Sequence, residues 1–289
     1  MFLKEELKTY LYWIEERENI RIQKEELNQT PPWTEDPILK EYKFCQVFRN
    51  DDRTSRWYID NIRNPLENSE EVFMATVIFR WFNLIQTGET LLKHNLHINW
   101  DSELANEKIR EQDQWITGAY VIKSPDGYDK LKGISLCIDY MWEQRKEILA
   151  KANSCQNSMQ DMWLYIKSFP FQGPFMAYEI VTDLSFTKFG RDAKDRLTWA
   201  NAGPGAMRGL NRLTGRDLDF KKKSHDWVGE MNELYKICRY LLPKSIFNSN
   251  RHPFELREVE GGLCEFDKYS RILKGQGRTR SKYAYNTSV

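Results

Sequence analysis

Hydrophobic residues recur at the spacing of an α-helix along most of the chain. Near the N-terminus, Leu3, Leu7 and Ile14 fall on one face, with Glu and Lys between them. The same periodicity, together with polar caps and flanking Gly or Pro, predicts further helices. One begins at an Asn68 cap paired with Glu71 and ends at Gly88; others cover 102–114, 135–151, 158–168 and 226–242, and a last one has Pro253 in its first turn.

Signals for strands and for separate domains are few. Residues 118–123 are the best candidate for a strand, and residues 124–127, Ser-Pro-Asp-Gly, predict a turn after it. Residues 30–33, Thr-Pro-Pro-Trp, break the first helix. No segment is rich enough in Pro, Gly or Ser to separate independent domains. We therefore expect an all-α protein.

The composition favours a soluble globular enzyme. The 289 residues are 40% hydrophobic and 29% charged, which excludes a disordered or collagen-like chain. No apolar run is long enough to span a bilayer, and charge begins at Lys4, too early for a secretory signal. The five Cys show no paired spacing and the four His are scattered, so we expect no disulfide, no structural metal and a reducing, cytoplasmic location.

Charge is balanced overall but uneven along the chain. The net charge is +1, yet residues 1–42 hold ten acidic and six basic side chains, whereas residues 191–223 hold four acidic and nine basic ones. Residues 261–289 add six basic and two acidic side chains. Separate basic zones can bind a phosphate backbone without a high isoelectric point, although solvated surface is the simpler explanation for any one of them.

Two glycine-bearing turns each lead into a predicted helix. Residues 161–184 predict a hairpin in which the turn 169–173 precedes a helix starting at Pro174, and backbone amides around Gly173 could hold a phosphate. Residues 202–213 place Gly203 and Gly205 before Arg208 and Arg212, which share a helical face and could clamp another phosphate. The alternatives are an ordinary helical hairpin and a loop that simply requires glycine. The second turn lacks the Gly-Lys-Ser/Thr ending of a Walker A loop.

Two further segments carry clustered charge. If residues 44–57 are helical, Arg49, Arg53 and Arg56 fall on one face beside Asp52 and could meet phosphate, or they could form a buried Arg–Asp network. Residues 263–269 place Glu265, Asp267 and Lys268 close enough for proton transfer, unless they are a salt-bridged helix end. The basic, Gly-rich tail at 275–283 could lie along DNA or fray.

The hairpin resembles the helix-hairpin-helix of DNA glycosylases. That motif has an aromatic-Pro-Gly-hydrophobic-Gly turn, whereas this chain has Phe171 in place of the first Gly. Glycosylases of this superfamily also carry a catalytic Asp about two dozen residues after the turn. Here residues 199–205 contain no Asp, and Asp195 is the nearest one.

Taken in order, four segments resemble the alpha-glutamyl/putrescinyl thymine pyrophosphorylase family and the related helical domain of phage 5-hydroxymethyl-deoxyuridine DNA kinases. The segments are 44–53, 173–184, 202–209 and 263–269, and the resemblance runs from about Tyr42 to Tyr283. It implies a helix-hairpin-helix DNA glycosylase-like fold with two lobes and an interlobe cleft. Residues 1–41 would be an N-terminal helical extension, and residues 42–289 the glycosylase-like domain with its basic tail.

The resemblance also implies a chemistry, which is DNA base hypermodification in phage DNA. The enzyme would transfer an amine or amino acid onto pyrophosphorylated 5-hydroxymethyluracil, flipped out of the duplex, and release pyrophosphate. Its partners would be DNA containing a modified pyrimidine and a small amine, with no membrane and no cofactor, although Mg²⁺ could accompany pyrophosphate. The implied base candidates are Asp183, Glu179, Glu265 and Asp267. The implied substrate- and phosphate-binding residues are Arg49, Asp52, Arg53, Arg56, Gly173, Tyr178, Asn201, Gly203, Gly205, Arg208 and Lys268.

Two other functions fit the same segments. One is a DNA glycosylase that excises a hypermodified base, in antiphage defence or repair, and leaves an abasic site instead of a base adduct. The other is a non-catalytic DNA-binding module, in which replacing Asp183 by Ala would not weaken binding.

Overall fold

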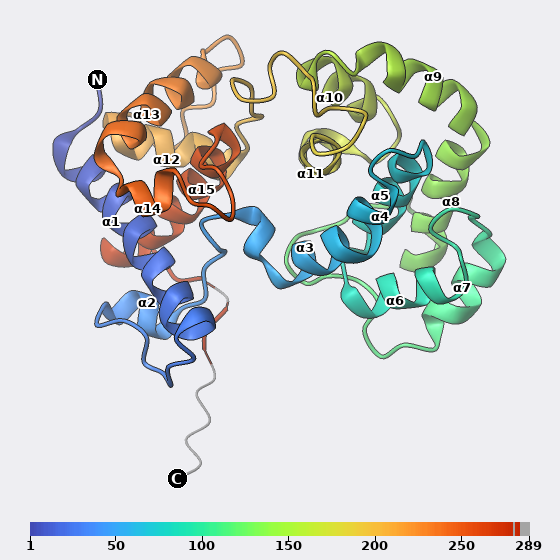
Figure 1. The fold of residues 1–289 in the computed structure, drawn as a ribbon, viewed down its shortest axis with the longest axis horizontal. Coiled ribbons are helices and arrows are strands. Elements are labelled where there is room, and N and C mark those ends of the chain that lie inside the picture. The colour runs from blue at the N-terminus through green and yellow to red at the C-terminus, as the bar shows by residue number, and fades with distance from the viewer. Residues whose placement is uncertain (280, 284–289) are drawn as a thin grey trace. The chain divides into compact units, whose positions relative to one another are not determined.

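A computed structural model describes residues 1–279 and 281–283, and it confirms an all-α protein (Figure 1). Within these residues the backbone forms no strand, and the one isolated antiparallel bridge joins Tyr42 to Lys282. The helices are α1 (Lys4–Arg21), η1 (Ile22–Glu26), α2 (Pro37–Glu41), η2 (Arg49–Asp51), α3 (Arg53–Tyr58), η3 (Ile59–Arg63), α4 (Asn64–Leu66), α5 (Glu71–Phe82), α6 (Ile85–Lys93), α7 (Ser102–Arg110), α8 (Lys130–Glu143), α9 (Arg145–Cys155), α10 (Met159–Lys167), α11 (Gly173–Leu184), α12 (Pro204–Thr214), α13 (Trp227–Leu241), α14 (Lys244–Phe247) and α15 (Leu256–Leu273).

The chain folds into two compact units. Unit 1 combines Met1–Asp52 with Ala200–Val289, and unit 2 is Arg53–Trp199. The first helix, expected to be an extension, belongs to unit 1 and packs against α15 and α12. The division into an extension (1–41) and a glycosylase-like domain (42–289) stays a prediction. The same holds for the glycosylase-like fold with a cleft between two lobes.

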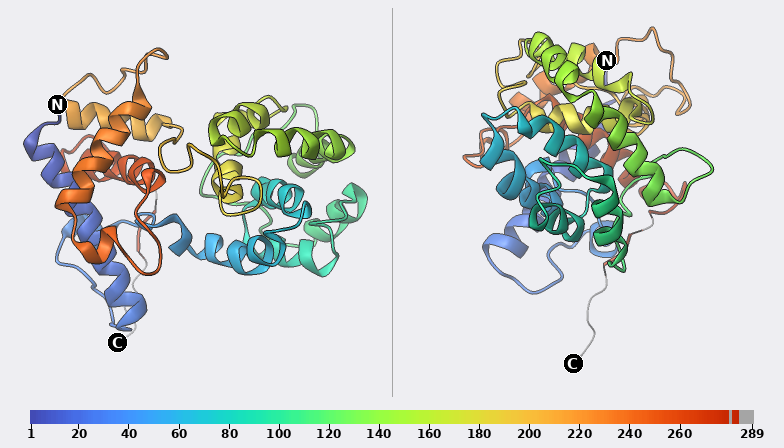
Figure 2. Two further views of the ribbon diagram at one scale, coloured as in Figure 1. Left: turned by 45° about the horizontal axis from the view of Figure 1, so that its top comes forward. Right: turned by 90° about the vertical axis from the view of Figure 1, so that its right-hand side faces the viewer.

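Unit 1 is organised around its last helix, α15. This helix contacts α1, α2, α12 and α13, and the views in Figures 1 and 2 show it among them. In one of these contacts Tyr10 of α1 is fully buried, and its ring meets that of Phe266 edge to face at 5.6 Å. The apolar face predicted for this helix was partly wrong, because Leu3 precedes α1 and is exposed. The largest helix contact in the unit is between α12 and α15, and glycines make it close, as described below.

Unit 2 is organised around α5. Eleven of its twelve residues are buried, as expected for a helix that is hydrophobic all round. It packs against α6, α8, α11 and η3. The core around it also takes in α9 and α10 through buried residues such as Ile148 and Met162.

Several predicted element boundaries were wrong, each for a tertiary reason. The helix α5 ends at Asn83, which takes a left-handed conformation, and Gly88 lies inside α6, where an added Cβ would be 2.3 Å from the ring of Trp57. Gly88 is therefore a packing glycine. Asn68 does not cap α5, because its side-chain oxygen accepts a hydrogen bond from the Arg191 guanidinium (2.7 Å) and the helix begins after Glu70. The predicted helix 135–151 is two helices, α8 and α9.

The C-terminal prediction and the strand prediction were also corrected. The last helix starts after a Glu255 cap whose partner is Glu258, so Pro253 precedes the helix. Residues 118–123 are not a strand, since they have no neighbour with which to form a ladder. The predicted start of a helix at Ser158 is confirmed, because the Ser158 hydroxyl caps α10 by accepting a hydrogen bond from the backbone nitrogen of Asp161. The predicted helix 226–242 is α13, and the Asp226 carboxylate caps it by accepting from the backbone nitrogen of Gly229.

The basic tail is folded back where the structure describes it. The backbone nitrogen of Lys43 donates to Ser281 (3.0 Å), and that of Tyr283 donates to Glu41 (3.0 Å). The ammonium of Lys282 also pairs with the Glu41 carboxylate. Arg280 and residues 284–289, part of the tail expected to lie along DNA, are outside the described residues.

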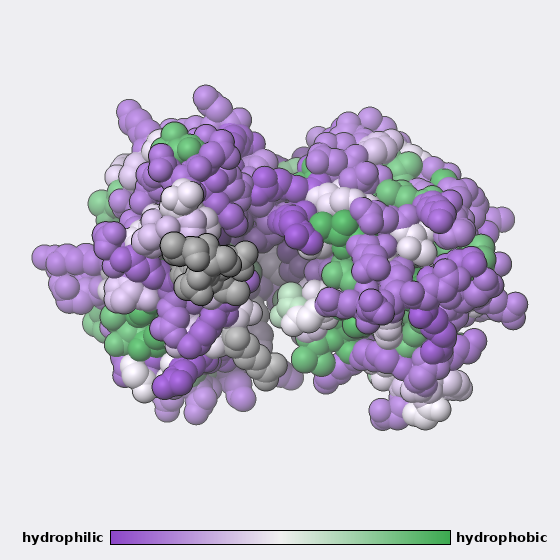
Figure 3. Space-filling model, turned by 90° about the horizontal axis from the view of Figure 1, so that it is seen from below, coloured by the Kyte–Doolittle hydropathy of each residue, from purple (hydrophilic) through white to green (hydrophobic). Residues whose placement is uncertain are grey.

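The visible surface is predominantly polar. Figure 3 shows a mostly hydrophilic face on which apolar residues form small, separate groups. Over residues 1–279 and 281–283, none of the helices combines the length and the apolar character needed to cross a bilayer.

Candidate functional site

The predicted hairpin is present and belongs to unit 2. Its helices α10 and α11 pack against each other, and the turn between them contains two left-handed residues, Phe171 (φ +61°) and Gly173 (φ +55°). A Cβ on Gly173 would meet no described heavy atom within 4 Å, so glycine is required there by the backbone angle and not by crowding. Phosphate binding by these amides stays a prediction.

The nearest Asp to the position of a glycosylase base, Asp195, is occupied by a structural role. Its carboxylate accepts hydrogen bonds from the Ser158 hydroxyl (3.0 Å) and from the backbone nitrogens of Met159 (2.6 Å) and Gln160 (3.0 Å). These groups form the N-terminus of α10, where unpaired amides favour an anion. Asp195, in the part of unit 2 that follows α11, thus connects that segment to the N-terminus of α10.

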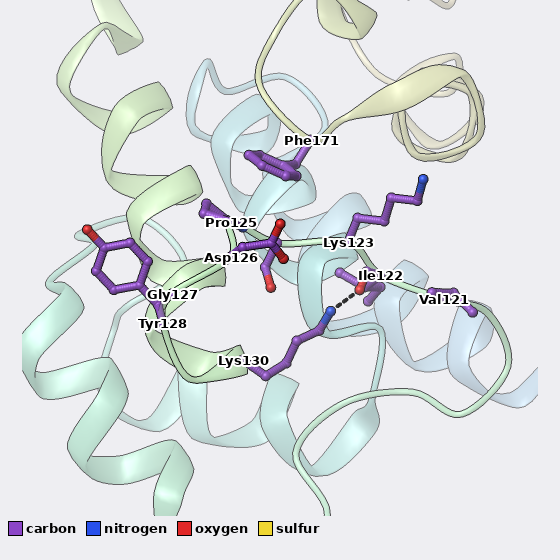
Figure 4. A pocket seen from close by; sticks show the side chains of 10 residues that line it. Val121, Ile122, Lys123, Pro125, Asp126, Gly127, Tyr128, Lys130 and Phe171 are labelled. Atoms are coloured by element: carbon purple, nitrogen blue, oxygen red, sulfur yellow. Dashed lines mark hydrogen bonds between the residues drawn. The ribbon is translucent and has the colours of Figure 1, made fainter.

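A shallow depression lies beside the hairpin turn. It has a volume of about 470 Å³ and is open to solvent, with Phe171 on one side and residues 121–130 on the other (Figure 4). Within it the Lys130 ammonium donates to the backbone oxygen of Ile122, which closes the loop on itself. In the sequence, residues 121–127 had been considered only as a possible strand and turn, and Phe171 only as a departure from the glycosylase turn.

The base candidates on α11 lie against a buried arginine. Asp183 is 5% exposed and accepts a hydrogen bond from Nε of Arg80, whose Nη1 is 3.8 Å from the Glu179 carboxylate. Arg80 itself is 2% exposed and also donates to Asn83 (2.6 Å). The guanidinium compensates both carboxylates, and this ion cluster holds α5 to α11. Arg80 was missed because it sits inside an apolar helix.

Tyr178 and Asn201 have different surroundings. Tyr178 is buried on α11, and its ring meets that of Trp199 at 5.8 Å, nearly edge to face. Asn201 is half-buried in the extended segment that precedes α12. The structure brings Tyr178 into the packing of unit 2, whereas Asn201 belongs to unit 1.

The glycines of the second turn bring α12 close to α15. A Cβ on Gly205 would be 2.4 Å from Sγ of Cys264, and one on Gly209 would be 2.4 Å from the backbone oxygen of Leu263. The pattern Gly-x-x-x-Gly therefore lets two helices touch backbone to backbone. The alternative explanation, that this segment requires glycine for a structural reason, is therefore confirmed for Gly205 and Gly209. Binding of a phosphate by these glycines stays a prediction.

The N-terminus of α12 already has one carboxylate beside it. The backbone nitrogen of Gly203 donates to Oε1 of Glu260 on α15 (3.3 Å). Further along α12, Nε of Arg208 (2.9 Å) and Nε of Arg212 (2.8 Å) hold the two oxygens of Asp267, which is 1% exposed. Arg208 keeps 40% of its side chain exposed, so its terminal nitrogens can reach an anion from solvent.

A second ion pair on α15, between Glu265 and Lys268, contacts the segment 44–52. Glu265 receives a hydrogen bond from the Lys268 ammonium and another, at 3.2 Å, from the backbone nitrogen of Cys45. Burial alone would lower the pKa of Lys268, but the Glu265 carboxylate outweighs it and raises that pKa. Lys268 is thus a fixed cation. Burial raises the pKa of the Cys264 thiol to about 12, so this thiol is not a ready nucleophile.

Asp52 has a proton affinity suited to proton transfer. Burial raises its pKa to about 6, against the opposing effects of a hydrogen bond from the Gln46 backbone nitrogen (3.2 Å) and of the charges of Arg17 and Arg49. A base with a pKa near neutrality both accepts and releases a proton readily. The sequence had placed Asp52 among the substrate-binding residues, because the burial that changes its pKa comes from tertiary packing.

The three arginines of the 44–57 segment do not share one helical face. Arg49 belongs to the short helix η2 in unit 1, and α3 starts only at Arg53, in unit 2. Arg53 and Arg56 are both exposed, one turn apart on α3. The prediction that these three arginines share one face of a single helix was therefore wrong.

The unit 1 cluster, defined as Asp52, Arg208, Glu265, Asp267 and Lys268, is thus built from three of the four sequence motifs. The Cys264 thiol lies close to several of these side chains, since it interacts electrostatically with Glu265, Lys268, Glu260 and Asp267. Among residues 1–279 and 281–283, no three His, Cys, Asp or Glu side chains are grouped so that they could hold a metal ion. The cluster combines carboxylates with cationic side chains.

The comparisons with known proteins agree on one family. Residues 4–278 match the family described as "5-hmdU DNA kinase, helical domain". The chain is also similar to the 5-hmdU DNA kinase of Bacillus phage SP10, with 27% identity over 283 residues, which is 90% of this chain and 44% of the relative. The chain thus spans less than half the length of that protein, and no solved structure matches it significantly. It belongs to the family of the helical domain of 5-hmdU DNA kinases.

Proposed function

We propose that this protein modifies thymine-derived bases in phage DNA, by transferring an amine or amino acid onto pyrophosphorylated 5-hydroxymethyluracil. The family match supports a role in the chemistry of 5-hydroxymethyluracil. Residues 1–289 contain no Gly-Lys-Ser or Gly-Lys-Thr sequence of a phosphate-binding loop, and the proposal concerns a step that follows phosphorylation of the base. The putrescinyl and glutamyl thymine enzymes that the sequence resembles suggest this later step.

The proposed reaction is a displacement at the 5-methylene carbon of the base. The amine nitrogen forms a bond to this carbon while the bond from carbon to the pyrophosphate oxygen breaks. Pyrophosphate leaves with the electron pair of the broken carbon–oxygen bond. The nitrogen loses one proton to a carboxylate, and the carboxylate then passes this proton to water. The glycosidic bond is untouched. Mg²⁺, if required, would arrive with the pyrophosphate as part of the substrate.

The observation that carries the proposal is the meeting of segments 44–52, 202–208 and 263–269 in the unit 1 cluster. Asp52, with a pKa of about 6, is the base that takes the proton from the amine. Arg208 and the Lys268 ammonium stabilise the charge that develops on pyrophosphate. Glu265 and Asp267 hold these cations in place, so we assign them positioning roles.

Asp195 bears on the glycosylase alternative. A glycosylase requires a carboxylate near the sugar of the flipped base, free to stabilise positive charge there. The three hydrogen bonds that Asp195 accepts at the start of α10 commit its oxygens to a helix terminus. This favours an enzyme that keeps the base attached to its sugar.

The test is mass spectrometry of nucleosides from DNA that carries 5-hydroxymethyluracil pyrophosphate, after incubation with the protein and candidate amines. We expect a nucleoside with the mass of 5-hydroxymethyl-deoxyuridine plus the amine minus one water, and a matching release of pyrophosphate. Asp52→Asn should abolish the adduct, whereas Asp60→Asn, which removes an exposed carboxylate on η3, should not. Alkali-labile sites in place of an adduct would instead establish a glycosylase.

A further inference from the structure

Phe171 is unfavourable in its position on two separate grounds. Its φ of +61° is in the left-handed region, which bulky side chains rarely adopt, and 45% of its surface is exposed. Two residues later the same turn uses glycine at φ +55°. Backbone strain of this kind persists mainly at functional sites, and Gly at position 171 would remove it.

The ring of Phe171 forms one side of the depression in unit 2. Figure 4 shows the ring above Pro125 and Asp126, with the side chain of Lys123 extending beside it. Tyr128, 56% exposed, and Val121, 84% exposed, line the same depression. The Lys130 ammonium donates a hydrogen bond to the backbone oxygen of Ile122, which links the two ends of the loop that lines the depression.

These groups provide the chemistry that recognises an unpaired nucleotide. An exposed aromatic face stacks on any base, a neighbouring ammonium attracts the phosphate, and a carboxylate such as Asp126 accepts hydrogen bonds from base amino groups. The depression, about 470 Å³, is within the usual range for binding sites and larger than a small amine needs. Its openness fits a segment of a polymer that enters and leaves along the surface.

We propose that the depression binds an unpaired nucleobase of DNA, stacked on Phe171, with the adjoining phosphate on Lys123. The proposal rests on the proposed function in taking DNA as the substrate, but it assigns a second place of contact, in unit 2. This contact would hold one unstacked base of the substrate DNA. Phe171 is a binding residue in this scheme and takes no part in bond making.

The experiment uses the full chain and a single-stranded oligonucleotide that contains 2-aminopurine, whose fluorescence is quenched on stacking. We expect Phe171→Gly to lose most of the quenching and to weaken binding by about 5- to 150-fold, the range expected for loss of one stacked base. Phe171→Trp should keep both the fluorescence quenching and the affinity of the wild type. Lys123→Gln should reduce the salt dependence of log K by about one unit of slope.

A matched control and a stability measurement separate this role from a structural one. Phe175 is 46% exposed on the same hairpin but does not line the depression, so Phe175→Ala should leave the quenching unchanged. Because glycine relieves the left-handed strain, Phe171→Gly should melt at the same temperature as the wild type or higher. Lower melting with unchanged quenching would show that Phe171 only packs the turn, and would overturn the proposal.

The remaining outcomes also decide. Absence of 2-aminopurine quenching by the wild-type protein would overturn the proposal, as would equal affinity of Phe171→Gly and wild type. Quenching that depends on Phe171, in a protein that forms no base adduct with any amine, would leave the nucleobase site standing and refute the transferase reaction instead.

Discussion

Replacing Gly209 by Ala tests whether glycine in α12 is there for helix packing. The added Cβ would lie 2.4 Å from the backbone oxygen of Leu263 and 2.9 Å from its carbonyl carbon. A normal contact between carbon and oxygen is about 3.3 Å, so α12 and α15 must separate by roughly 1 Å. A gap of this size forfeits about a quarter to a half of the dispersion attraction of the atoms lining it.

The magnitude follows from two opposing effects. Overpacking against a backbone, which cannot rotate away as a side chain does, costs about 3 kcal/mol, at the upper end of the usual range. Alanine gains about 1 kcal/mol over glycine in a helix interior. We expect Gly209→Ala to lower the free energy of unfolding by about 2 kcal/mol, which corresponds to a melting temperature lower by roughly 4–8 °C.

The assay is thermal unfolding followed by circular dichroism, with Gly261→Ala as the matched control. Gly261 is in the interior of α15, where a Cβ would meet no described heavy atom within 4 Å. The same chemical change there should raise stability by about 0.5–1 kcal/mol. If Gly209→Ala is as stable as Gly261→Ala, the close approach of α12 to α15 is not as described, and the packing explanation of the glycine pattern fails.

Three further predictions follow from single side chains. The folded protein holds the Asp52 proton more tightly than the unfolded chain does, so stability should fall as pH rises from 3.8 to about 6, and urea titrations should find this dependence absent in Asp52→Asn. Asp195→Ala removes three hydrogen bonds at the start of α10 and should lower the free energy of unfolding by about 1–2 kcal/mol, yet leave the yield of base adduct per folded molecule unchanged; loss of the adduct would mean that Asp195 is catalytic. Gly88→Ala places a Cβ 2.3 Å from the Trp57 ring and should lower the melting temperature and shift tryptophan fluorescence; an unchanged spectrum would show that the ring moves aside freely.

The local features of the hairpin were accessible from sequence because neighbouring residues determine them. The Ser158 cap, the turn at 169–173 and the helix beginning at Gly173 depend on contacts within a few residues. The positive φ of Phe171 was not accessible in this way, because the expected residue there is glycine. Its neighbours across the depression come from residues 121–130, between 41 and 50 positions earlier in the chain.

The periodicity of apolar residues was sufficient to predict an all-α chain. The order of four motifs indicated the helical domain of 5-hydroxymethyl-deoxyuridine DNA kinases, which the family match confirms, whereas the resemblance to the thymine pyrophosphorylases stays a prediction. Tertiary structure decided the roles of the charged side chains, because a charge takes its properties from what surrounds it. Asp183 is compensated by an arginine of α5, Asp267 is held by two arginines of α12, and Asp52 has its proton affinity raised by burial. All three are plain carboxylates in the sequence, and only the distant segments packed around them make them different.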